Sequence, residues 1–312
     1  MAVRVGARAP AGRRLSSFGF RHPWVRLTGQ LAPGLLWLGG LYLGSLSALL
    51  YYSFWRLESG IAARPIPDLG LQMYEQLWQP ANRDIIIRTT VMATTVTIAC
   101  AVIAFPLAHY MARYASPRMK TLLYLGVLMP LWSSYMVRVL SWKLILAKDG
   151  IASWFVERTG LESVLGFFLG LPGIGGPSLS TSDFGRFIVF VYTWLPYMIL
   201  PLQAALDRIP GSFVEASSDL GARPRTTFRQ VVLPLAFPGL VAGSIFTFSL
   251  TLGDFIIPQI IGDSSFFIGA VVYVQQGTAG NLPLAAAFSV VPMVIMALYL
   301  FGAKRAGAFE AM

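Results

Sequence analysis

Long apolar runs recur along almost the whole chain, and each is long enough to cross a bilayer as a helix. The runs cover about residues 31–55, 85–112, 121–147, 185–206, 235–258 and 282–303. A membrane-spanning helix needs about 20 mostly apolar residues, because the hydrocarbon core is roughly 30 Å thick. We therefore predict an all-α, polytopic membrane protein of about six transmembrane helices.

The charge content excludes several other classes of protein. Only 12% of the 312 residues are charged, about half of what is usual in soluble domains. The formal net charge of +10 comes from small basic groups between the apolar runs. A nucleic-acid-binding face would concentrate such residues in a dense patch. We therefore expect membrane lipid, and no nucleic acid, among the partners.

The sequence offers few residues for metal or covalent chemistry. Cys100 is the single cysteine and lies within an apolar run, and the two histidines are His22 and His109. A structural zinc site needs about four cysteine or histidine ligands. No nucleophile stands beside a base in a recognisable pattern. We expect no metal site, no internal disulfide and no catalytic residue.

Basic residues outside the spans indicate the orientation, since cytoplasmic segments carry an excess of Lys and Arg. They gather in the N-terminal arm of residues 1–30, between the second and third spans, after the fourth span, and in the tail of residues 304–312. The alternate segments hold fewer. We predict a transmembrane domain over residues 31–303 with both termini in the cytoplasm.

Residues 207–234, between the fourth and fifth spans, form the most informative segment. Ser212 and Glu215 have the spacing of a capping box that begins a helix. Gly221 can end that helix in the left-handed conformation, and Pro224 suits the first turn of a second short helix. We predict two short helices on the cytoplasmic side. Because such helices are marginal alone, they need a surface, either a partner protein or their own membrane domain.

Within this segment the run Glu215-Ala216-Ser217 is followed after three residues by Gly221, and later by Leu233-Pro234. This spacing resembles the EAA loop of ABC importer permeases, the inner-membrane subunits of binding-protein-dependent transport. Ser217 departs from the second alanine of the family pattern, a small-for-small change. The resemblance implies that these six residues couple the permease to an ATPase.

Residues 129–151, 194–210 and 252–262 narrow the resemblance to spermidine/putrescine permeases of the PotB type. Lys143 stands where that subfamily would have an uncharged residue. The resemblance implies import of a small organic cation, such as spermidine or putrescine, across a bacterial inner membrane. The alternatives are an ABC permease for another solute, such as an iron complex, an opine or a phosphonate, or a secondary transporter.

The same resemblance implies the partners. They are a second permease subunit in a heterodimer, two ATP-binding subunits and an extracytoplasmic solute-binding protein. ATP and Mg²⁺ would bind the partner ATPase, and no cofactor is expected in this chain. The sequence agrees, because a phosphate-binding loop needs Gly-Lys followed by Ser or Thr, and no lysine here follows a glycine.

Asp254 is the one acidic residue well inside a predicted span, so it is a candidate for the substrate pathway. Trp132, Tyr135 and Trp194 could offer aromatic faces to an ammonium group. Other roles stay open. Asp254 could pair with Arg138 or Lys143, or lie near the outer surface, and the aromatic residues could anchor the spans at the membrane interface.

Overall fold

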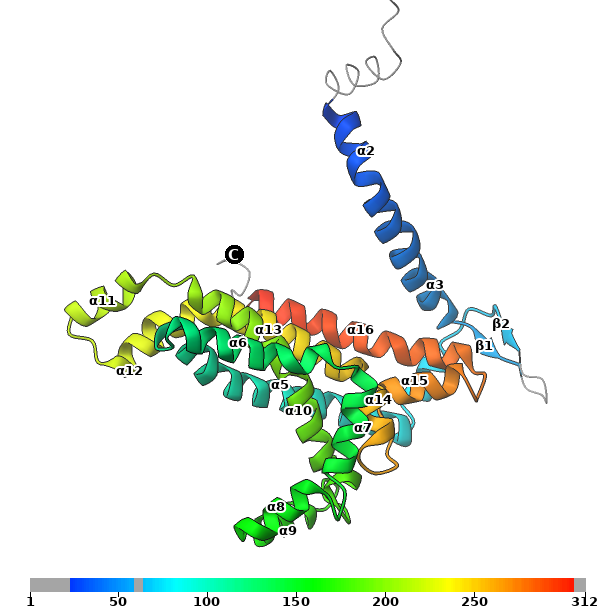
Figure 1. Ribbon diagram of the computed structural model, residues 1–312. Coiled ribbons are helices and arrows are strands. Elements are labelled where there is room, and N and C mark those ends of the chain that lie inside the picture. The colour runs from blue at the N-terminus through cyan, green and yellow to red at the C-terminus, as the bar shows by residue number, and fades with distance from the viewer. Residues whose placement is uncertain (1–22, 59–63, 306–312) are drawn as a thin grey trace, which may run out of the picture. The chain divides into compact units, whose positions relative to one another are not determined.

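The computed structural model describes residues 23–58 and 64–305 (Figure 1). Contacts divide the chain into two units, residues 1–52 and 53–312, and each is described by itself. The predicted arm therefore falls largely outside the described residues, as does most of the predicted C-terminal tail. The described part is predominantly helical, as the apolar runs predicted.

The described part of the first unit, residues 23–52, is one continuous helical segment. It consists of α2 (Pro23–Leu36), a π-helical stretch η1 (Trp37–Leu43) and α3 (Gly44–Tyr52). Residues 27–52 of this segment are apolar enough to cross a membrane. The helix thus begins within the predicted arm and stops before the predicted end of the first span at residue 55.

The second unit begins with a short antiparallel pair, β1 (Arg56–Leu57) and β2 (Pro65–Ile66), in which Arg56 lies opposite Ile66. The first half of its helical part comprises α4 (Gln72–Leu77), α5 (Pro80–Arg113), α6 (Pro117–Trp132), α7 (Tyr135–Ile145), α8 (Ile151–Thr159), α9 (Glu162–Leu169) and η2 (Leu179–Thr181). The second half comprises α10 (Asp183–Asp207), α11 (Gly211–Asp219), α12 (Pro224–Thr227), the π-helical η3 (Phe228–Val232), α13 (Leu233–Gly253), α14 (Ile256–Ile260), α15 (Ile268–Gln276) and α16 (Leu282–Arg305).

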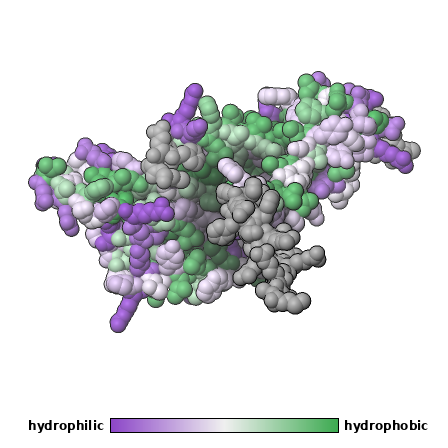
Figure 2. Space-filling view, turned by 90° about the horizontal axis from the view of Figure 1, so that it is seen from above, coloured by the Kyte–Doolittle hydropathy of each residue, from purple (hydrophilic) through white to green (hydrophobic). Residues whose placement is uncertain are grey.

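In the described residues of the whole chain, five helical segments are long and apolar enough to cross a membrane, or six if α6 and α7 count as one broken span. The predicted ranges 85–112, 185–206 and 282–303 fall within α5, α10 and α16. In the space-filling view, hydrophobic side chains cover much of the middle of the face shown, and hydrophilic ones gather toward its ends (Figure 2). This distribution is typical of a protein surrounded by lipid.

The predicted span over residues 121–147 corresponds to a bent pair of helices, α6 and α7. Helices α6 and α7 meet at 98°. Ser133 and Ser134 between them have extended backbone, with ψ of 148° and 136°. The Arg138 side chain donates to the Ser133 carbonyl oxygen at 3.0 Å, so a backbone group freed by the break is satisfied inside the protein.

Helix α10 lies at the centre of the second unit and packs against both α5 and α13. Two glycines on α13, Gly239 and Gly243, permit the close approach of α10. An added Cβ would lie 2.3 Å from the Ala205 side chain at Gly239, and 2.8 Å from Met198 Sδ at Gly243. Small residues four apart are the usual device for such contact between membrane helices, where backbones must come close for dispersion forces to act.

The start of α10 is fixed by a fully buried arginine. Arg186 donates to the Ile261 carbonyl oxygen at 2.9 Å and the Asp263 carbonyl oxygen at 3.0 Å, and pairs with the Asp183 carboxylate. Its guanidinium also lies 4.6 Å from the centroid of the Phe267 ring. Arg186 therefore ties α10 to the loop between α14 and α15.

Asp263 supplies a second carboxylate to this network, with Oδ1 3.3 Å from an Arg186 nitrogen. Partial burial opposes ionisation of Asp263, but hydrogen bonds from Ser265 and the nearby Arg186 charge hold the pKa of its carboxyl below the ordinary value. The loop passes closely around the guanidinium at Gly262, where φ is 96° and an added Cβ would lie 2.3 Å from an Arg186 nitrogen. Only glycine fits this turn without strain.

Replacing Arg186 with Met should lower the free energy of unfolding by about 3 to 5 kcal/mol, because it strands a buried carboxylate at Asp183. Arg56→Met is the matched control. Arg56 pairs with Asp68 at 2.9 Å, but both side chains are about half exposed. Loss of this exposed ion pair should lower the free energy of unfolding by only about 0 to 1 kcal/mol. The unfolding temperature of each purified variant in detergent tests this prediction. Equal decreases for Arg186→Met and Arg56→Met would contradict the assigned role of Arg186.

Candidate functional site

Helix α11 ends at the turn that the sequence predicted. Gly221 has φ of 78°. The N–H of Ala222 donates to the Ser217 carbonyl oxygen at 3.1 Å, and that of Gly221 to the Ser218 carbonyl oxygen at 2.9 Å. This pair of bonds is a Schellman motif, in which a left-handed glycine satisfies the last carbonyls of the helix. The predicted conformation of Gly221 is confirmed.

The predicted capping box at the other end of α11 is wrong. The helix begins at Gly211 after Pro210, and no side-chain hydrogen bond caps this end. A capping serine must stand outside the helix with extended backbone, whereas Ser212 already lies inside it. Pro210 takes the extended position instead, with ψ of 141°.

The segments that lead into and out of the two loop helices are held against the membrane helices at several points. Arg113, at the end of α5, donates to the Ile209 carbonyl oxygen at 3.0 Å. Lys120 of α6 pairs with Asp207 at the end of α10 at 2.8 Å. Phe228 meets the Phe105 ring edge to face, with ring centroids 5.3 Å apart. The approach from α10 and the continuation into α13 are therefore both held by α5 and α6.

Ser217 has a structural role that the sequence did not reveal. Its hydroxyl lies 2.9 Å from the Thr227 hydroxyl, so a hydrogen bond joins α11 to α12. The alanine usual at this position in the EAA pattern could not form that bond. A serine and a threonine ten residues apart gave no signal of contact, because the intervening turn decides which residues meet.

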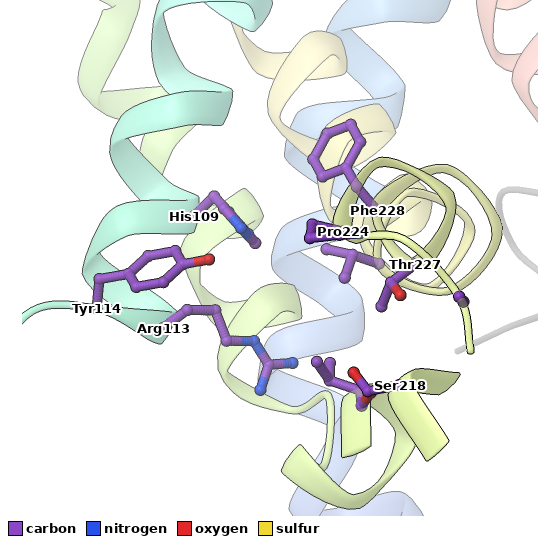
Figure 3. A pocket seen from close by; sticks show the side chains of 10 residues that line it. His109, Arg113, Tyr114, Ser218, Pro224, Thr227 and Phe228 are labelled. Atoms are coloured by element: carbon purple, nitrogen blue, oxygen red, sulfur yellow. The ribbon is translucent and has the colours of Figure 1, made fainter. Parts of the chain in front are cut away.

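A pocket of about 380 Å³ lies between the end of α5 and the loop helices (Figure 3). It is lined by His109, Arg113, Tyr114, Val214, Ser218, Ala222, Pro224, Thr227, Phe228 and Val232. In Figure 3 the side chains of His109, Arg113 and Tyr114 extend from α5 toward the loop. The pocket therefore separates part of the loop helices from the end of α5.

The outer surface of α11 carries large apolar side chains beside the motif residues. Leu220 is 89% exposed and Phe213 49% exposed. Glu215 and Ala216 are also exposed, as is Pro234 at the start of α13, while Leu233 is half-buried. Such an apolar surface on a polar segment is typical of a site that binds another protein.

The second candidate region lies at the end of α13. The predicted span over residues 235–258 stops at Gly253, so the prediction that Asp254 lies well inside a helix is wrong. Asp254 has extended backbone, with ψ of 135°. Its Oδ1 accepts hydrogen bonds from the N–H groups of Ile256 at 2.8 Å and Ile257 at 3.3 Å. Asp254 therefore binds the first turn of α14 across the break.

Two of the three predicted aromatic residues lie with Asp254. The Tyr135 hydroxyl donates to Asp254 Oδ2. The Tyr135 ring stacks on Trp194, with centroids 5.7 Å apart and an interplanar angle of 24°, and Trp194 contacts Tyr197. Asp254 is only 8% exposed, whereas Tyr135 and Tyr197 are half-buried. The two tyrosines are therefore the more accessible part of this cluster, whereas Trp194 is as buried as Asp254.

The remaining residues predicted for this region do not join the cluster. Trp132 is 74% exposed at the end of α6. In the described part of the chain, no ion pair links Asp254 to Arg138 or Lys143, since Arg138 bonds to Ser133. The described residues also contain no group of three or more His, Cys, Asp or Glu side chains placed to hold a metal ion.

Residues 104–305 match the family described as the binding-protein-dependent transport system inner membrane component. This match spans more than half of the chain. The chain belongs to this family. It is a permease subunit of an ABC importer, a multi-pass inner-membrane protein, and such subunits are not themselves enzymes.

The permease is 54% identical over 303 residues to the inner membrane ABC transporter permease protein YdcU of Escherichia coli, covering 97% of this chain and 96% of YdcU. It is 28% identical over 239 residues to the spermidine/putrescine transport system permease protein PotB of Haemophilus influenzae, covering 76% and 79% of the two chains. A bacterial ABC transporter involved in alginate import shares the fold, with a TM-score of 0.68 and 16% identity over 94% of this permease and 99% of that chain.

Replacing Gly221 with Val should impair coupling, because a β-branched residue in the left-handed region costs about 1 to 2 kcal/mol and distorts the turn between α11 and α12. We expect normal membrane insertion but reduced transport-linked ATP hydrolysis in the assembled importer. Gly211→Ala is the control. It lies in the same helix, where an added Cβ would meet nothing nearer than 3.9 Å. Wild-type hydrolysis and uptake in Gly221→Val would contradict the role of this turn.

Proposed function

We propose that this permease forms one half of a passage that carries a small organic cation, such as spermidine or putrescine, into the cytoplasm. The observation that carries the proposal is the Asp254 carboxylate bonded to Tyr135, whose ring stacks on Trp194. Aromatic faces attract ammonium groups, and a carboxylate in a water-poor site strengthens that attraction. The relatedness to PotB supports the same class of solute.

The hydrogen bonds of Asp254 leave it able to accept one more donor. A carboxylate has about four lone-pair sites. Tyr135 and the N–H groups of Ile256 and Ile257 occupy three of them. These three donors stabilise the negative charge without neutralising it. A passing ammonium group could therefore donate a hydrogen bond to the fourth lone pair of Asp254, if the tyrosine side chains move enough to admit it.

The proposed partners are supported by the family and by residues 207–234, here called the coupling loop. We propose a heterodimer with a second permease, two cytoplasmic ATP-binding subunits that hold ATP and Mg²⁺, and an extracytoplasmic solute-binding protein. Glu215, Ala216, Ser217, Gly221, Leu233 and Pro234 would lie at or behind the ATPase contact, supported by the exposed apolar surface of α11. The distribution of basic residues favours cytoplasmic termini, and this supports a loop on the same side as the ATPases.

A second candidate is import of a different solute by the same architecture. The alginate importer shares the fold although its cargo is an acidic polysaccharide, so the fold itself does not select the solute. The local chemistry discriminates between the two. An anionic cargo would be repelled by Asp254, whereas a cation would be attracted.

Solute-dependent ATP hydrolysis tests the proposal. The permease is purified with its co-expressed partner subunits and mixed with the cognate binding protein loaded with spermidine, putrescine, a ferric complex or a phosphonate. We expect stimulation by a polyamine alone. Stimulation by the ferric complex or the phosphonate alone would overturn the proposed substrate and favour the second candidate.

Asp254→Asn should slow polyamine uptake by about tenfold or more, equivalent to about 1.4 kcal/mol. The gross attraction at 4 Å is about 4 kcal/mol at an effective dielectric near 20, before desolvation is subtracted. Asparagine keeps an oxygen for the N–H groups of α14, so assembly and ATPase binding should be retained. Asp68→Asn, which alters an exposed pair with Arg56, is the control. Wild-type uptake by Asp254→Asn would remove this residue from the pathway.

A further inference from the structure

Helices α8 and α9 form a short hairpin between α7 and α10. They are joined at Gly160, which has φ of 70°. With nine and eight residues, each helix is only about 13 Å long, too short to cross a hydrocarbon core of roughly 30 Å. Figure 1 shows the hairpin near the end of α10 that is remote from α11 and α12. Because α10 is a membrane-spanning segment, the hairpin lies on the side opposite the coupling loop.

One side of the hairpin is attached to the body of the second unit. Phe168 of α9 stacks on Phe184 of α10, with centroids 4.5 Å apart and rings nearly parallel at 3°. Ala152, Leu165 and Leu169 pack against the main core. The hairpin is therefore held in place by its inward side and does not depend on another protein for its position.

The outward side carries an unusual amount of apolar surface. Its large apolar side chains, here called the hairpin stripe, are all at least 47% exposed. They are Ile151, Trp154 and Phe155 of α8, then Leu161, Val164 and Phe167 at and within α9. Spacings of three and four place the members from each helix on one face.

Two glutamates of the hairpin face a groove on its inner side. Glu157 and Glu162 line a groove of about 310 Å³ together with Lys148 and Ser178, between the hairpin and the chain that leads to α10. The hairpin is therefore amphipathic across its thickness, with an acidic inner groove and an apolar outer face.

Arg158 lies on the same face of α8 as the stripe, and its guanidinium carbon lies 5.8 Å from the centroid of the Trp154 ring. Tryptophan prefers the membrane–water interface, and arginine can lay its apolar stem along a hydrophobic surface while its charge reaches the headgroups. The pair thus matches the chemistry of a lipid surface, with anionic phosphates outside and acyl chains beneath.

Exposed apolar side chains also lie on α7, the helix that precedes the hairpin. Val137, Leu140 and Leu144 are exposed along one face of α7, and the chain then leads through a short turn to Ile151. That turn carries Lys148 and Asp149, both exposed, and such charges can reach the headgroups when a hairpin lies at the lipid surface. We propose that the hairpin lies flat in the lipid interface opposite the coupling loop, with the stripe among the acyl chains and Arg158 near the phosphates.

Quenching by brominated lipid tests this placement in the assembled importer. Phe155→Cys and Phe167→Cys place a fluorescent label on the stripe, and Glu157→Cys places it on the inner groove as a matched control. Cys100 is buried and stays unlabelled. The complexes are reconstituted into nanodiscs whose phospholipids carry bromine on the acyl chains or lack it. We expect about twofold quenching at both stripe positions, since an interfacial helix buries its apolar face roughly 5 to 10 Å deep.

The control should show much less quenching than either stripe position. If either stripe label is quenched no more than the label at residue 157, the lipid placement is overturned. Cross-linking of the same stripe cysteines in high yield to the second permease or to the binding protein would also overturn it, and would identify the stripe as a protein interface. Neither result bears on the coupling loop or on the solute, so the proposed function is tested separately.

Discussion

The close contact between α10 and α13 is the constraint on which the rest of the second unit depends. In lipid, the hydrophobic effect does not drive helices together, so that packing must come from backbones that approach closely. Gly239 and Gly243 allow this, since any side chain there would overlap Ala205 or Met198. Once α13 is fixed on α10, the loop between them has a fixed span to bridge, and α11 and α12 must fold within it. The position of Asp254, just beyond the far end of α13, is set by the same contact.

Much of the fold was predictable because the bilayer imposes a simple rule on length and polarity. The ranges within α5, α10 and α16 follow from apolar composition alone. The break between α6 and α7 did not, because Ser133 and Ser134 are compatible with either a helix or an extended turn, and the Arg138 side chain that satisfies the Ser133 carbonyl comes from the next helix. A pattern of hydrophobicity carries no information about such a bond. Hydrophobicity also did not predict that α13 stops at Gly253. The apolar run continues, but Asp254 accepts hydrogen bonds from the N–H groups of Ile256 and Ile257 beyond the break.

Local chemistry was predictable in the coupling loop where one residue determines the geometry, as Gly221 does through its positive φ. The prediction was wrong at the start of α11, because either Pro210 or Ser212 could occupy the position just before the helix. Contacts between distant segments were beyond the sequence altogether. Tyr135 and Asp254 are brought together only when α7 and α14 pack, and Arg186 meets its partners only when the loop after α14 folds over the start of α10. Asp254 was noticed as a charge in an apolar run, but its partners were not foreseen.

The helical continuity from α12 through η3 to α13 has a mechanical consequence. Residues 224–253 form one uninterrupted rod of 30 residues, about 45 Å long. Its tightest contact with the body, at Gly239 and Gly243, lies near the middle of that length. One continuous helical segment therefore connects the turn at Gly221 to Asp254, with no flexible linker between them. A displacement of the loop helices would reach the carboxylate through that helix.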